Sequence, residues 1–514
     1  MTTIPSRPPE KDESPEEAAA QTARAALRRA QKLNSILDVA KAMTVERDLD
    51  ALLELILRET KRVVEADRCT IFILDSEHDV LWSRVAQGLE TKEIRLPVGQ
   101  GIAGWVAQNN AVLNIPDAYA DERFHRSVDH ATGYRTRNVL CAPMRGAGGE
   151  LVGCIQALNR AGDSPFDEED EELLLALGGQ AAAAIQNTLL HQSVEKLFEG
   201  FVKASVVAIE SRDPTTSGHS ERVAALTVAL AKVVDEVDSG LYRDATFGQR
   251  DIRELRYAAL LHDFGKVGVR EQVLVKSKKL YPHELEALRM RFELVKTTIE
   301  RDHVRSVLDR APKNEWLGTD QAERELAEKL AELDEMWDFI EACNRPTILE
   351  EGSFERLQDL ARMEVPMGSG KTFLLSPDEV TVLSIPKGSL SAEERAEIES
   401  HVTHTFRFLS QIPWTPELRR VPQVAYAHHE KLDGGGYPRG LPEEQIPLGA
   451  RMMAIADIYD ALAARDRPYK KAVPHEKALD ILRSEAERGF LDRELLRLFI
   501  DKDVVGQALP ESIR

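Results

Sequence analysis

A run of strong helix formers begins after Pro165 and divides the chain into two halves of different character. A pair of glycines at 178–179 is its main interruption, and the acidic residues 167–169 load its first turn, which suits the positive end of a helix dipole. A helix of this length between two modules is typical of a signalling stalk and of a dimer seam. We therefore predict a connecting helix over 166–205 and a homodimer formed through it; a helix that merely packs on its neighbours is the alternative.

The half before this helix is rich in short β-type segments that alternate or run apolar, with Gly and Asp between them. They are CTIFILD (69–75), LWSRVAQG (81–88), AVLNI (111–115), RNVLCAPM (137–144) and ELVGCIQALN (150–159). Helical patterns precede them, from Pro15 onward and over 49–65. We predict an α+β domain with leading helices over 17–165, after a disordered segment at 1–16 that is rich in Pro, Ser and charge.

The half after the connecting helix is helical in pattern nearly to its end. Residues 320–342 are strongly amphipathic, and VTVLSI at 380–385 is the main strand-like run. The sequence therefore predicts a multidomain chain whose second half is an all-α bundle over 206–500, followed by a tail at 501–514.

Histidines lie beside acids at several places in this helical half. The histidines occur in SGHSERV (217–223), LLHDFGK (260–266), HVTH (401–404) and AHHEK (427–431), and two aspartates lie in the apolar segment MMAIADIYDAL (452–462). An Asp inside an apolar helix is costly unless it is paired or bound to metal. Imidazole and carboxylate are the usual ligands for divalent metals, and helices can bring them together from distant parts of a chain. We predict that these side chains cage a pair of divalent ions.

These motifs are similar to those of a known family. HDFGK (262–266), HHEKLDGGGYP (428–438), RDPTTSGHSERV (212–223) and ADIYDALAARDRPYKKA (456–472) resemble, in order and context, the HD-GYP family of cyclic-di-GMP phosphodiesterases, a branch of the HD phosphohydrolases. The resemblance covers about residues 200–310 and 385–490. It implies an all-α HD-type bundle that hydrolyses cyclic-di-GMP to pGpG or GMP.

Carried over to this sequence, the resemblance implies a role for each matching residue. The metal ligands would be His219, His262, Asp263, His401, His428, His429 and Asp457. Asp263 would bridge two metals, with Fe or Mn favoured over Zn, and a water activated by them would attack the phosphorus. Lys266 would contact the scissile phosphate, with Arg467 and Lys470 on its other oxygens. The loop residues Gly434, Gly436, Tyr437 and Pro438 would border the site.

The chain departs from the family pattern in two places. Some members hold a third metal through a Glu where this chain has Thr215, so two metals are expected. The third histidine, His401, lies 138 residues after Asp263, whereas the family places it about one helix later.

An insertion at about 280–388 explains the long separation. KKLYPHELEALRMRF (278–292) resembles GSLSAEERAEIESHV (388–402), and in this alignment Arg291 stands where His401 stands. The fallback ligands are His283, His303 and His404. If the insertion displaced the helix of His401, the enzyme would be silent. Within the insertion, GSGKT (368–372) lacks the first glycine of a phosphate-binding loop, since Val365 stands there, and we predict a flexible loop.

The α+β half resembles a GAF domain over about 35–190, and in particular the cyclic-nucleotide-binding GAF domains of phosphodiesterases and adenylyl cyclases. The segments that carry this resemblance are RCTIFILD (68–75), GIAGWVA (101–107), NIPDAYADERF (114–124) and VDHATGYRTRNVLCAPM (128–144). Asn159-Arg160, Phe166 and Asp170-Glu171 are similar to an NK…F…DE signature, which we expect to lock a loop to the closing helix.

By this resemblance, Cys69, Ile102, Ala103, Asp129, Thr132 and Thr136 would line a pocket for a purine nucleotide such as cAMP or cGMP. Another small ligand, or a scaffold without ligand, remains an alternative for this domain.

Composition excludes some partners. Lys plus Arg number 67 and Asp plus Glu 87, and the formal net charge of -20 disfavours a nucleic-acid polymer or an anionic membrane as partner. The four cysteines are scattered, which disfavours a disulfide scaffold, and we predict neither a signal peptide nor an uncharged apolar run of membrane-spanning length. We therefore expect a cytoplasmic protein.

The sequence as a whole predicts a signalling enzyme in which a GAF sensor regulates a dimetal phosphodiesterase that acts on cyclic-di-GMP. The alternatives are an HD hydrolase of another cyclic dinucleotide, a silent regulator that acts through protein partners, and a pure cyclic-nucleotide receptor.

Overall fold

The computed structural model describes residues 37–83, 94–126, 129, 133–212, 218–310, 319–464 and 472–510. The chain divides at Glu199/Gly200 into two compact units, here called the sheet unit and the helical unit. The segment predicted to be disordered, 1–16, lies outside the described residues.

The sheet unit contains a six-stranded sheet in the order β3-β2-β1-β6-β5-β4, in which every neighbouring pair is antiparallel. The strands are β1 (Ala66–Asp75), β2 (Val80–Ser83), β3 (Ile94–Pro97), β4 (Leu113–Ile115), β5 (Val139–Arg145) and β6 (Leu151–Arg160). Side chains alternate along a strand, so the central strands β1, β5 and β6 contribute to a core on both faces of the sheet. This is the α+β fold that the sequence predicts.

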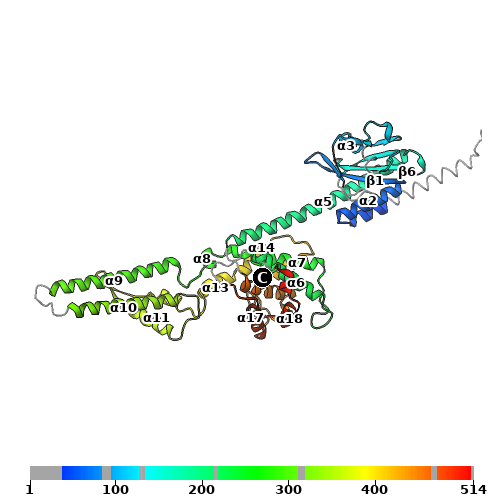
Figure 1. The fold of residues 1–514 in the computed structure, drawn as a ribbon. Helices are drawn as coiled ribbons and strands as arrows, with labels where there is room; N and C mark the ends of the chain where they lie inside the picture. The colour runs from blue at the N-terminus through cyan, green and yellow to red at the C-terminus, as the bar shows by residue number, and fades with distance from the viewer. Residues whose placement is uncertain are drawn as a thin grey trace, which may run out of the picture. The chain divides into compact units, whose positions relative to one another are not determined.

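Two apolar cores lie on opposite faces of the sheet. On one face, α2 (Leu49–Val63) and the first part of α5 (Glu168–Glu210) cover Ile71, Ile155 and their neighbours. On the other face, α3 (Gly101–Asn109) covers Phe72, Cys141 and Cys154 (Figure 1). Asp48 caps α2 by accepting a hydrogen bond from the N–H of Ala51.

The helix expected after Pro165 is present as α5, a continuous helix of 43 residues with acids in its first turn. It contains a window apolar enough to span a membrane by length and composition, with a mean hydropathy of 1.4. Residues 173–190 indeed carry no charged side chain, so our reading that no such run exists was wrong. Leu174, Leu177 and Ile185 in this run are fully buried against the sheet, which gives the apolar composition a packing role.

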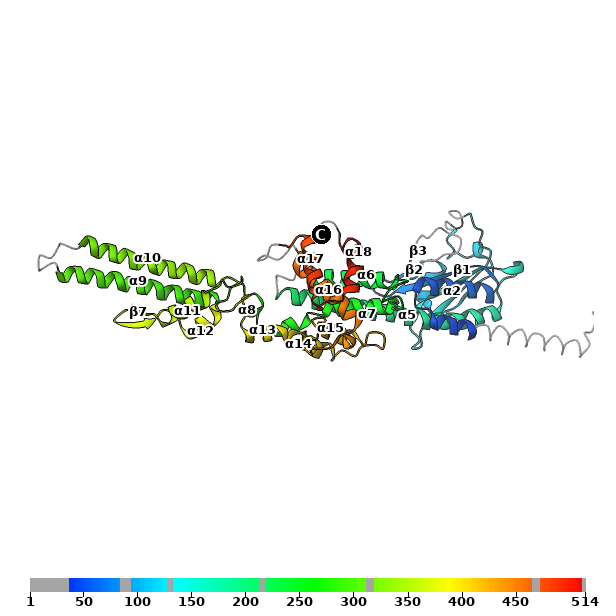
Figure 2. The ribbon, with the colours of Figure 1, turned by 90° about the horizontal axis from the view of Figure 1, so that it is seen from below.

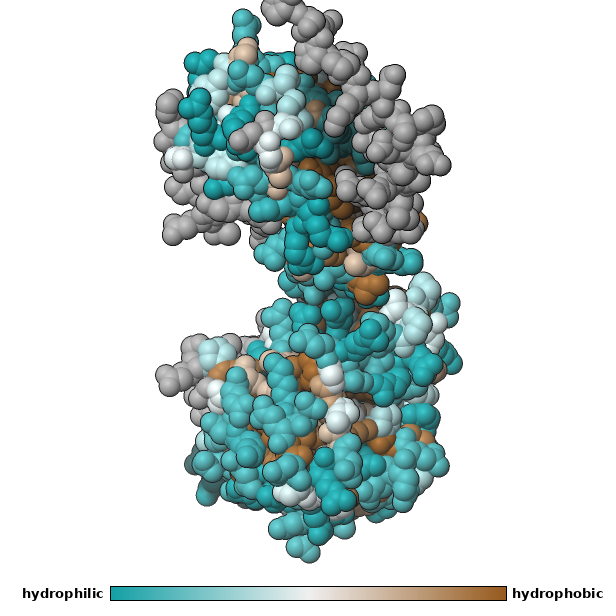
Figure 3. Space-filling view, turned by 90° about the vertical axis from the view of Figure 1, so that its right-hand side faces the viewer, coloured by the Kyte–Doolittle hydropathy of each residue, from teal (hydrophilic) through white to brown (hydrophobic). Residues whose placement is uncertain are grey.

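The helical unit is a bundle around α6 (His219–Asp235), which contacts α7 (Gln249–Leu261), α16 (Leu448–Ala463), α18 (Arg493–Asp501) and α19 (Val504–Ala508). Shorter elements complete it: η4 (Phe264–Gly268), α8 (Glu271–Leu274), α13 (Ala392–Glu399), α14 (His401–Leu409), α15 (Val421–Tyr426), η6 (Glu443–Gln445) and α17 (His475–Glu487). On the face shown in Figure 3, most surface residues are hydrophilic.

The predicted insertion forms a helical arm with its own apolar core. Its elements are α9 (Pro282–Arg310), α10 (Thr319–Cys343), α11 (Ser353–Arg362), β7 (Glu364–Met367), β8 (Gly370–Phe373) and α12 (Pro377–Leu383). The helices α9 and α10 lie side by side in both views (Figures 1 and 2), with Phe292, Leu333 and Ile340 buried in the core that the arm elements share.

Two local predictions within the arm were wrong. VTVLSI does not form a strand, because Ser376 and Glu379 form a capping box that starts α12, and this helix contains most of the segment. GSGKT is not an irregular loop, because it spans the turn and second strand of the β7–β8 hairpin, where Met367 pairs with Gly370. A hairpin also lacks the strand–loop–helix context of a phosphate-binding loop.

Candidate metal centre

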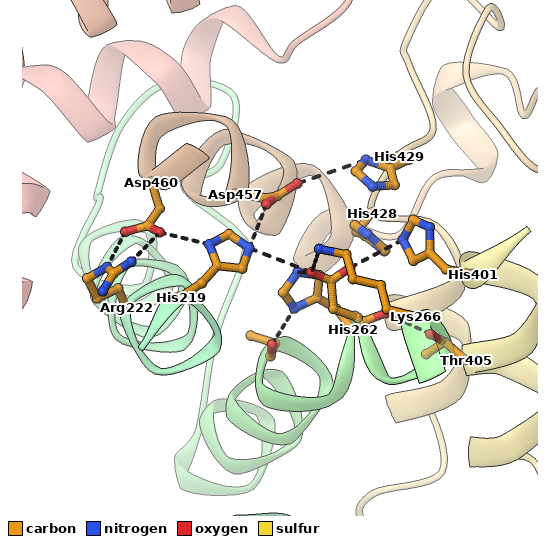
Figure 4. A network of polar contacts seen from close by, with 12 residues as sticks. His219, Arg222, His262, Lys266, His401, Thr405, His428, His429, Asp457 and Asp460 are labelled. Carbon is orange, nitrogen blue, oxygen red and sulfur yellow. Dashed lines mark hydrogen bonds and ion pairs between the residues drawn. The ribbon is translucent and has the colours of Figure 1, made fainter. Parts of the chain in front are cut away.

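The predicted metal ligands converge in the helical unit, although they come from distant parts of the chain (Figure 4). His219 is the first residue of α6, His262 is the C-cap of α7, His401 is the first residue of α14, and Asp457 lies on α16. His428 and His429 follow α15. The ligand atoms of His219, His262 and Asp263 lie within 4.8 Å of one another, as do those of His401, His428 and His429.

Three of these histidines share one arrangement of hydrogen bonds. In each, Nδ1 lies beside the backbone carbonyl of the residue three positions earlier: Ala259 for His262 (2.6 Å), Ile398 for His401 (2.6 Å) and Ala425 for His428 (2.7 Å). A carbonyl oxygen can only accept, so Nδ1 carries the proton and Nε2 of the neutral ring has a free lone pair.

Nε2 of each of these three rings is buried and has no hydrogen-bond partner among the described residues. A buried polar atom without a partner costs about 1–3 kcal/mol, so such atoms are rare unless a ligand satisfies them. Histidines that bind metal show this pattern, with one nitrogen donating to a carbonyl and the other directed at the ion. The donor set therefore fits a metal better than it fits a protein hydrogen-bond network.

Asp263 lies at the centre of the cluster. Its Oδ1 is 3.2 Å from Nε2 of His401, and its Oδ2 is 3.4 Å from Nε2 of His262 and 2.9 Å from Nζ of Lys266. The two oxygens therefore face different imidazoles, and each could serve as a donor to a divalent ion. Burial raises the pKa of Asp263, but the Lys266 ammonium and the nearby imidazoles outweigh it and hold the pKa well below its ordinary value.

His219 lies between two carboxylates. Its Nδ1 donates to Oδ2 of Asp460 at 2.7 Å, and its Nε2 is 3.2 Å from Oδ1 of Asp457. Burial lowers the pKa of His219, but the two carboxylates outweigh it and raise the pKa to about 9. The position between His219 and Asp457 therefore favours a positive charge, which a divalent ion would supply.

Asp460 and Arg222 support this histidine, and the sequence analysis assigned neither of them a role. Arg222 donates from Nε to Oδ1 of Asp460 at 2.6 Å. Each partner lies three residues after a predicted ligand, Arg222 after His219 and Asp460 after Asp457, and residues three apart share a helix face. This spacing on two helices was the signal that could have identified them.

His428 and His429 are held as neutral rings. Burial, followed by the neighbouring imidazoles, lowers the pKa of His428 well below its ordinary value. Burial also lowers the pKa of His429, to about 4, although nearby Asp457 opposes it. A neutral imidazole is the form that binds a metal ion.

The arm does not displace His401 from the cluster. The turn at Gly265 lies so close to α14 that a Cβ on this residue would be 1.9 Å from the carbonyl oxygen of His401. Thr405 joins the two segments, because its hydroxyl accepts from the N–H of Gly265 at 2.8 Å and donates to the carbonyl of His262 at 2.9 Å. These contacts hold α14 against the HD turn and direct His401 at Asp263.

The three fallback histidines lie elsewhere. His404 lies against Gly268, His283 stacks on Tyr281, and His303 lines a cavity of the arm that also includes Ile299 and Lys329.

The two similar segments at the ends of the insertion begin their helices alike. The N–H of Tyr281 donates to Glu284, and the N–H of Ser391 donates to Glu394, so both helices begin with a carboxylate three residues after the cap. Glu394 also accepts from Lys276 at 2.7 Å and from the hydroxyl of Tyr281 at 2.5 Å. The base of the arm is therefore tied to the helix that leads to His401.

The predicted signature loop folds back on the histidine pair. The N–H of Tyr437 donates to the carbonyl of His429, and their rings lie 4.8 Å apart. A Cβ on Gly436 would be 2.3 Å from the backbone nitrogen of Lys431, so the loop can close only with glycine there. Gly434 has a φ of 77°, and Tyr437–Pro438 is a cis peptide. Arg467, Lys470 and Thr215 lie outside the described residues.

The residues predicted to line a nucleotide pocket in the sheet unit do not converge as the predicted metal ligands do. Cys69 lies in the core beneath α2 and α5, whereas Ile102 and Ala103 lie in the core on the opposite face. Successive residues of a strand point to opposite faces, and the side-chain direction of Cys69 therefore excludes it from a pocket beside α3. Thr132 lies outside the described residues.

Asp129 and Thr136 bond to each other. The N–H and hydroxyl of Thr136 donate to Asp129 at 2.7 and 2.8 Å, and the hydroxyl of Tyr119 donates to it at 3.1 Å. The expected lock is present, because Nε of Arg160 lies 2.7 Å from Oδ2 of Asp170 at the start of α5.

Comparisons with known proteins agree with the division of the chain into a sheet unit and a helical unit. The GAF domain family matches residues 48–185, one HD domain family matches 216–344, and a second HD domain family matches 320–495. The chain therefore consists of an N-terminal α+β GAF domain followed by a mostly helical HD region.

Two curated relatives are phosphodiesterases by name. The dual 3′,5′-cyclic-AMP and -GMP phosphodiesterase 11A of Takifugu rubripes is 33% identical over 175 residues, which cover 32% of this chain and 19% of the relative. The probable 3′,5′-cyclic phosphodiesterase pde-5 of Caenorhabditis elegans is 32% identical over 176 residues, which cover 32% of this chain and 24% of the relative. The chain thus matches about a quarter or less of the length of these relatives, to which it is homologous.

Among solved structures, the GAF domain of a phosphoenolpyruvate-protein phosphotransferase from Coxiella burnetii is 23% identical, with a TM-score of 0.29, over 32% of this chain and 98% of that one. A putative GAF sensor protein from Burkholderia vietnamiensis is 18% identical, with a TM-score of 0.27, and the match covers 31% of this chain and 97% of that one.

Proposed function

We propose that the HD region is a metal-dependent phosphodiesterase that hydrolyses cyclic-di-GMP to pGpG or GMP. The observation that carries the proposal is the set of three buried Nε2 atoms, those of His262, His401 and His428, which have no hydrogen-bond partner among the described residues. Two of them, in His262 and His401, face the oxygens of Asp263. Buried nitrogens without a partner, beside a carboxylate whose two oxygens face different imidazoles, are a donor set for a pair of divalent ions.

The residues of the chain would hold two ions in distinct places. His219, His262 and Asp263 form one group of donors, and His401, His428 and His429 form the other. Asp457 lies between the groups, with Oδ1 3.2 Å from Nε2 of His219 and Oδ2 3.9 Å from Nδ1 of His429. Bound divalent ions would supply activation of the attacking water and neutralisation of phosphate charge. Fe or Mn is proposed on the family resemblance.

Lys266 is the charged group best placed to act on substrate. Its Nζ lies 2.9 Å from Asp263, and its side chain is 17% exposed, so it reaches the cluster and still borders solvent. An ammonium there would stabilise the charge that develops on a non-bridging phosphate oxygen. Tyr437, whose ring lies 4.8 Å from that of His429, would form a wall of the same site.

The choice of cyclic-di-GMP rests on the GGGYP loop at 434–438 and its contact with His429. The named relatives favour a second candidate, hydrolysis of cAMP or cGMP. Their match of 175 or 176 residues is too short to include both the GAF domain and the HD region of this chain, so it does not carry their substrates to the metal centre.

A matched set of variants tests the proposal. Purified protein with Mn or Fe should hydrolyse cyclic-di-GMP faster than cAMP or cGMP, and Asp263→Asn and His401→Ala should each abolish it. His404→Ala, on the same helix but directed at Gly268, should retain activity. Activity in Asp263→Asn would refute the chemistry, and a protein that holds no metal would support the silent regulator.

The GAF domain is proposed to bind a cyclic nucleotide and so regulate the enzyme. The phosphodiesterases named above support this proposal through their homology. Titration calorimetry of the protein with cAMP and cGMP tests it, and absence of heat with both would favour a scaffold role.

A homodimer through α5 is part of the proposal. Leu190, Val194, Leu197 and Phe201 are exposed by 64, 56, 76 and 44%, and their spacing of four, three and four residues is that of a coiled-coil seam. Sedimentation of Leu197→Asp should give a monomer where the native chain gives a dimer; a native monomer would contradict the proposal.

A further inference from the structure

The end of α5 touches two segments that carry groups of the metal centre. Oε2 of Glu210, the last residue of the helix, accepts a hydrogen bond from the N–H of Gly218 at 3.0 Å. Arg212 donates from its guanidinium to the carbonyl of Val267 at 2.9 Å. Gly218 immediately precedes His219, and Val267 immediately follows Lys266. All of these residues belong to the helical unit.

Glu210 supplies a hydrogen-bond acceptor at the start of α6, where the N-cap residue has no side chain that could accept. Gly218 is the N-cap of α6, has a φ of 65°, and has no side chain that could accept from the first turn. A carboxylate near the positive end of a helix is favourable by about 0.3–1 kcal/mol, and here it binds the N–H next to the ligand His219. The other oxygen of Glu210 is buried and has no hydrogen-bond partner among the described residues.

Arg212 holds the opposite side of the HD turn. Its backbone N–H donates to the carbonyl of Ile209, which continues the last turn of α5 and ties the arginine to the helix. The turn it reaches, η4, is already fixed on its inner side by the Thr405 bond to Gly265. A shift of α5 would therefore act on Val267 and, through it, on the backbone of Lys266.

The contact between α5 and the bundle is partly open to solvent. Val202, Val206 and Ile209 of α5 are buried. A pocket of about 280 Å³ that opens to solvent lies among α5, α6 and α7, bordered by Lys203, Ala224 and Leu260. The bundle therefore does not enclose α5 on this side.

We propose that Glu210 and Arg212 are positioning residues that couple the position of α5 to His219 and Lys266. Rotation of α5 about its axis, set by the state of the sheet unit, moves both side chains together. It thereby changes the geometry of one metal ligand and of the lysine that contacts phosphate. This inference rests on the proposed function of the HD region.

Substitutions at the two contacts test the coupling in the full chain. Arg212→Ala should lower kcat for cyclic-di-GMP by about tenfold with KM nearly unchanged, because a misplaced Lys266 weakens stabilisation of the transition state. Arg212→Lys keeps a donor and should restore part of kcat. Glu210→Ala should lower the metal content measured by elemental analysis, and Glu210→Gln, which keeps an acceptor, should lower it less.

Ser211→Ala is the matched control, because its hydroxyl donates to the carbonyl of Ala208, one turn earlier in the same segment. It should leave kcat and metal content as in the native chain. A purely structural role for Arg212 would lower the melting temperature and leave kcat per folded molecule unchanged, and that result would overturn the proposal.

Insertions into α5 test whether its rotation changes the activity of the metal centre. Two residues added after Glu199 rotate the segments by about 200°, whereas seven residues return the helix nearly to its original phase. In the native background, the two-residue insertion should change kcat several-fold more than the seven-residue insertion. In the Glu210→Ala/Arg212→Ala background, this difference should disappear.

Equal effects of the two insertions in the native background would overturn the coupling while leaving the hydrolase intact. A chain that hydrolyses none of the cyclic nucleotides with any metal would instead refute the proposed function. The two failures are therefore distinguishable.

Discussion

The metal centre and the predicted nucleotide pocket differ in how their polar atoms are satisfied. In the helical unit, His262, His401 and His428 each leave a buried nitrogen without a partner among the described residues. In the sheet unit, Asp129 and Thr136 satisfy each other, and Cys69 lies on the other face of the sheet from Ile102. Unsatisfied buried donors or acceptors point to an external ligand, whereas satisfied ones are compatible with a purely structural role.

Removal of metal should produce the largest difference in response between the HD region and the GAF domain. Chelation should abolish hydrolysis and lower the melting transition of the HD region, since an ion at 100 times its Kd contributes about 2.7 kcal/mol per site. The GAF transition should not move. Differential scanning calorimetry with and without chelator measures both, with Asp263→Asn as the control that should not respond. Chelation that leaves both transitions in place would contradict the comparison.

Gly265→Ala should have the next largest effect. The added Cβ would lie 1.9 Å from the carbonyl of His401 and 2.5 Å from the nitrogen of Thr405, so α14 must move. Overpacking of this kind costs about 1–3 kcal/mol, and a ligand misplaced by about 1 Å can lower the rate about a hundredfold.

Steady-state hydrolysis and thermal unfolding measure the two effects of Gly265→Ala. Gly370→Ala is the control, because a Cβ there meets nothing within 4 Å. Full activity in Gly265→Ala would show that His401 is not a ligand.

Asp129→Asn tests whether Asp129 of the sheet unit has a structural role or binds a ligand. If Asp129 serves structure, loss of one acceptor for Thr136 should destabilise the GAF transition by about 1–3 kcal/mol without changing the activity of the metal centre. Thr136→Ser keeps the hydroxyl and should be milder. Unchanged stability combined with lost cAMP or cGMP binding would instead make Asp129 a ligand residue.

Glu394→Gln should have the smallest effect, and one that depends on pH. Burial raises the pKa of Glu394, but its bonds from Lys276 and Tyr281 outweigh it and lower the pKa below 4.5. Its contribution to stability, about 1 kcal/mol, is therefore complete above pH 4.5 and is lost as the pH falls below that value.

Chemical denaturation at pH 7 and pH 3 compares Glu394→Gln with the native chain. The difference in the free energy of unfolding should shrink in acid. A difference that stays constant with pH would show that the ionised carboxylate is not responsible.

Much of the chain could be predicted from local sequence. The alternation in ELVGCIQALN predicts β6, and the acidic first turn after Pro165 predicts α5. VTVLSI was misread because β-branched residues favour strands, whereas the capping box at Ser376 and Glu379 starts a helix there.

The sequence by itself determined the kinds of ligand and their motifs, because an HD pair, an HH pair and a core Asp are costly in any fold that does not use them. Only the tertiary structure decided which histidine joins Asp263, because that choice depends on the close approach of Gly265 to α14 across 136 residues of chain. It also decided on which face of the sheet Cys69 lies and that Asp460 orients His219, since both depend on the packing of elements distant in sequence.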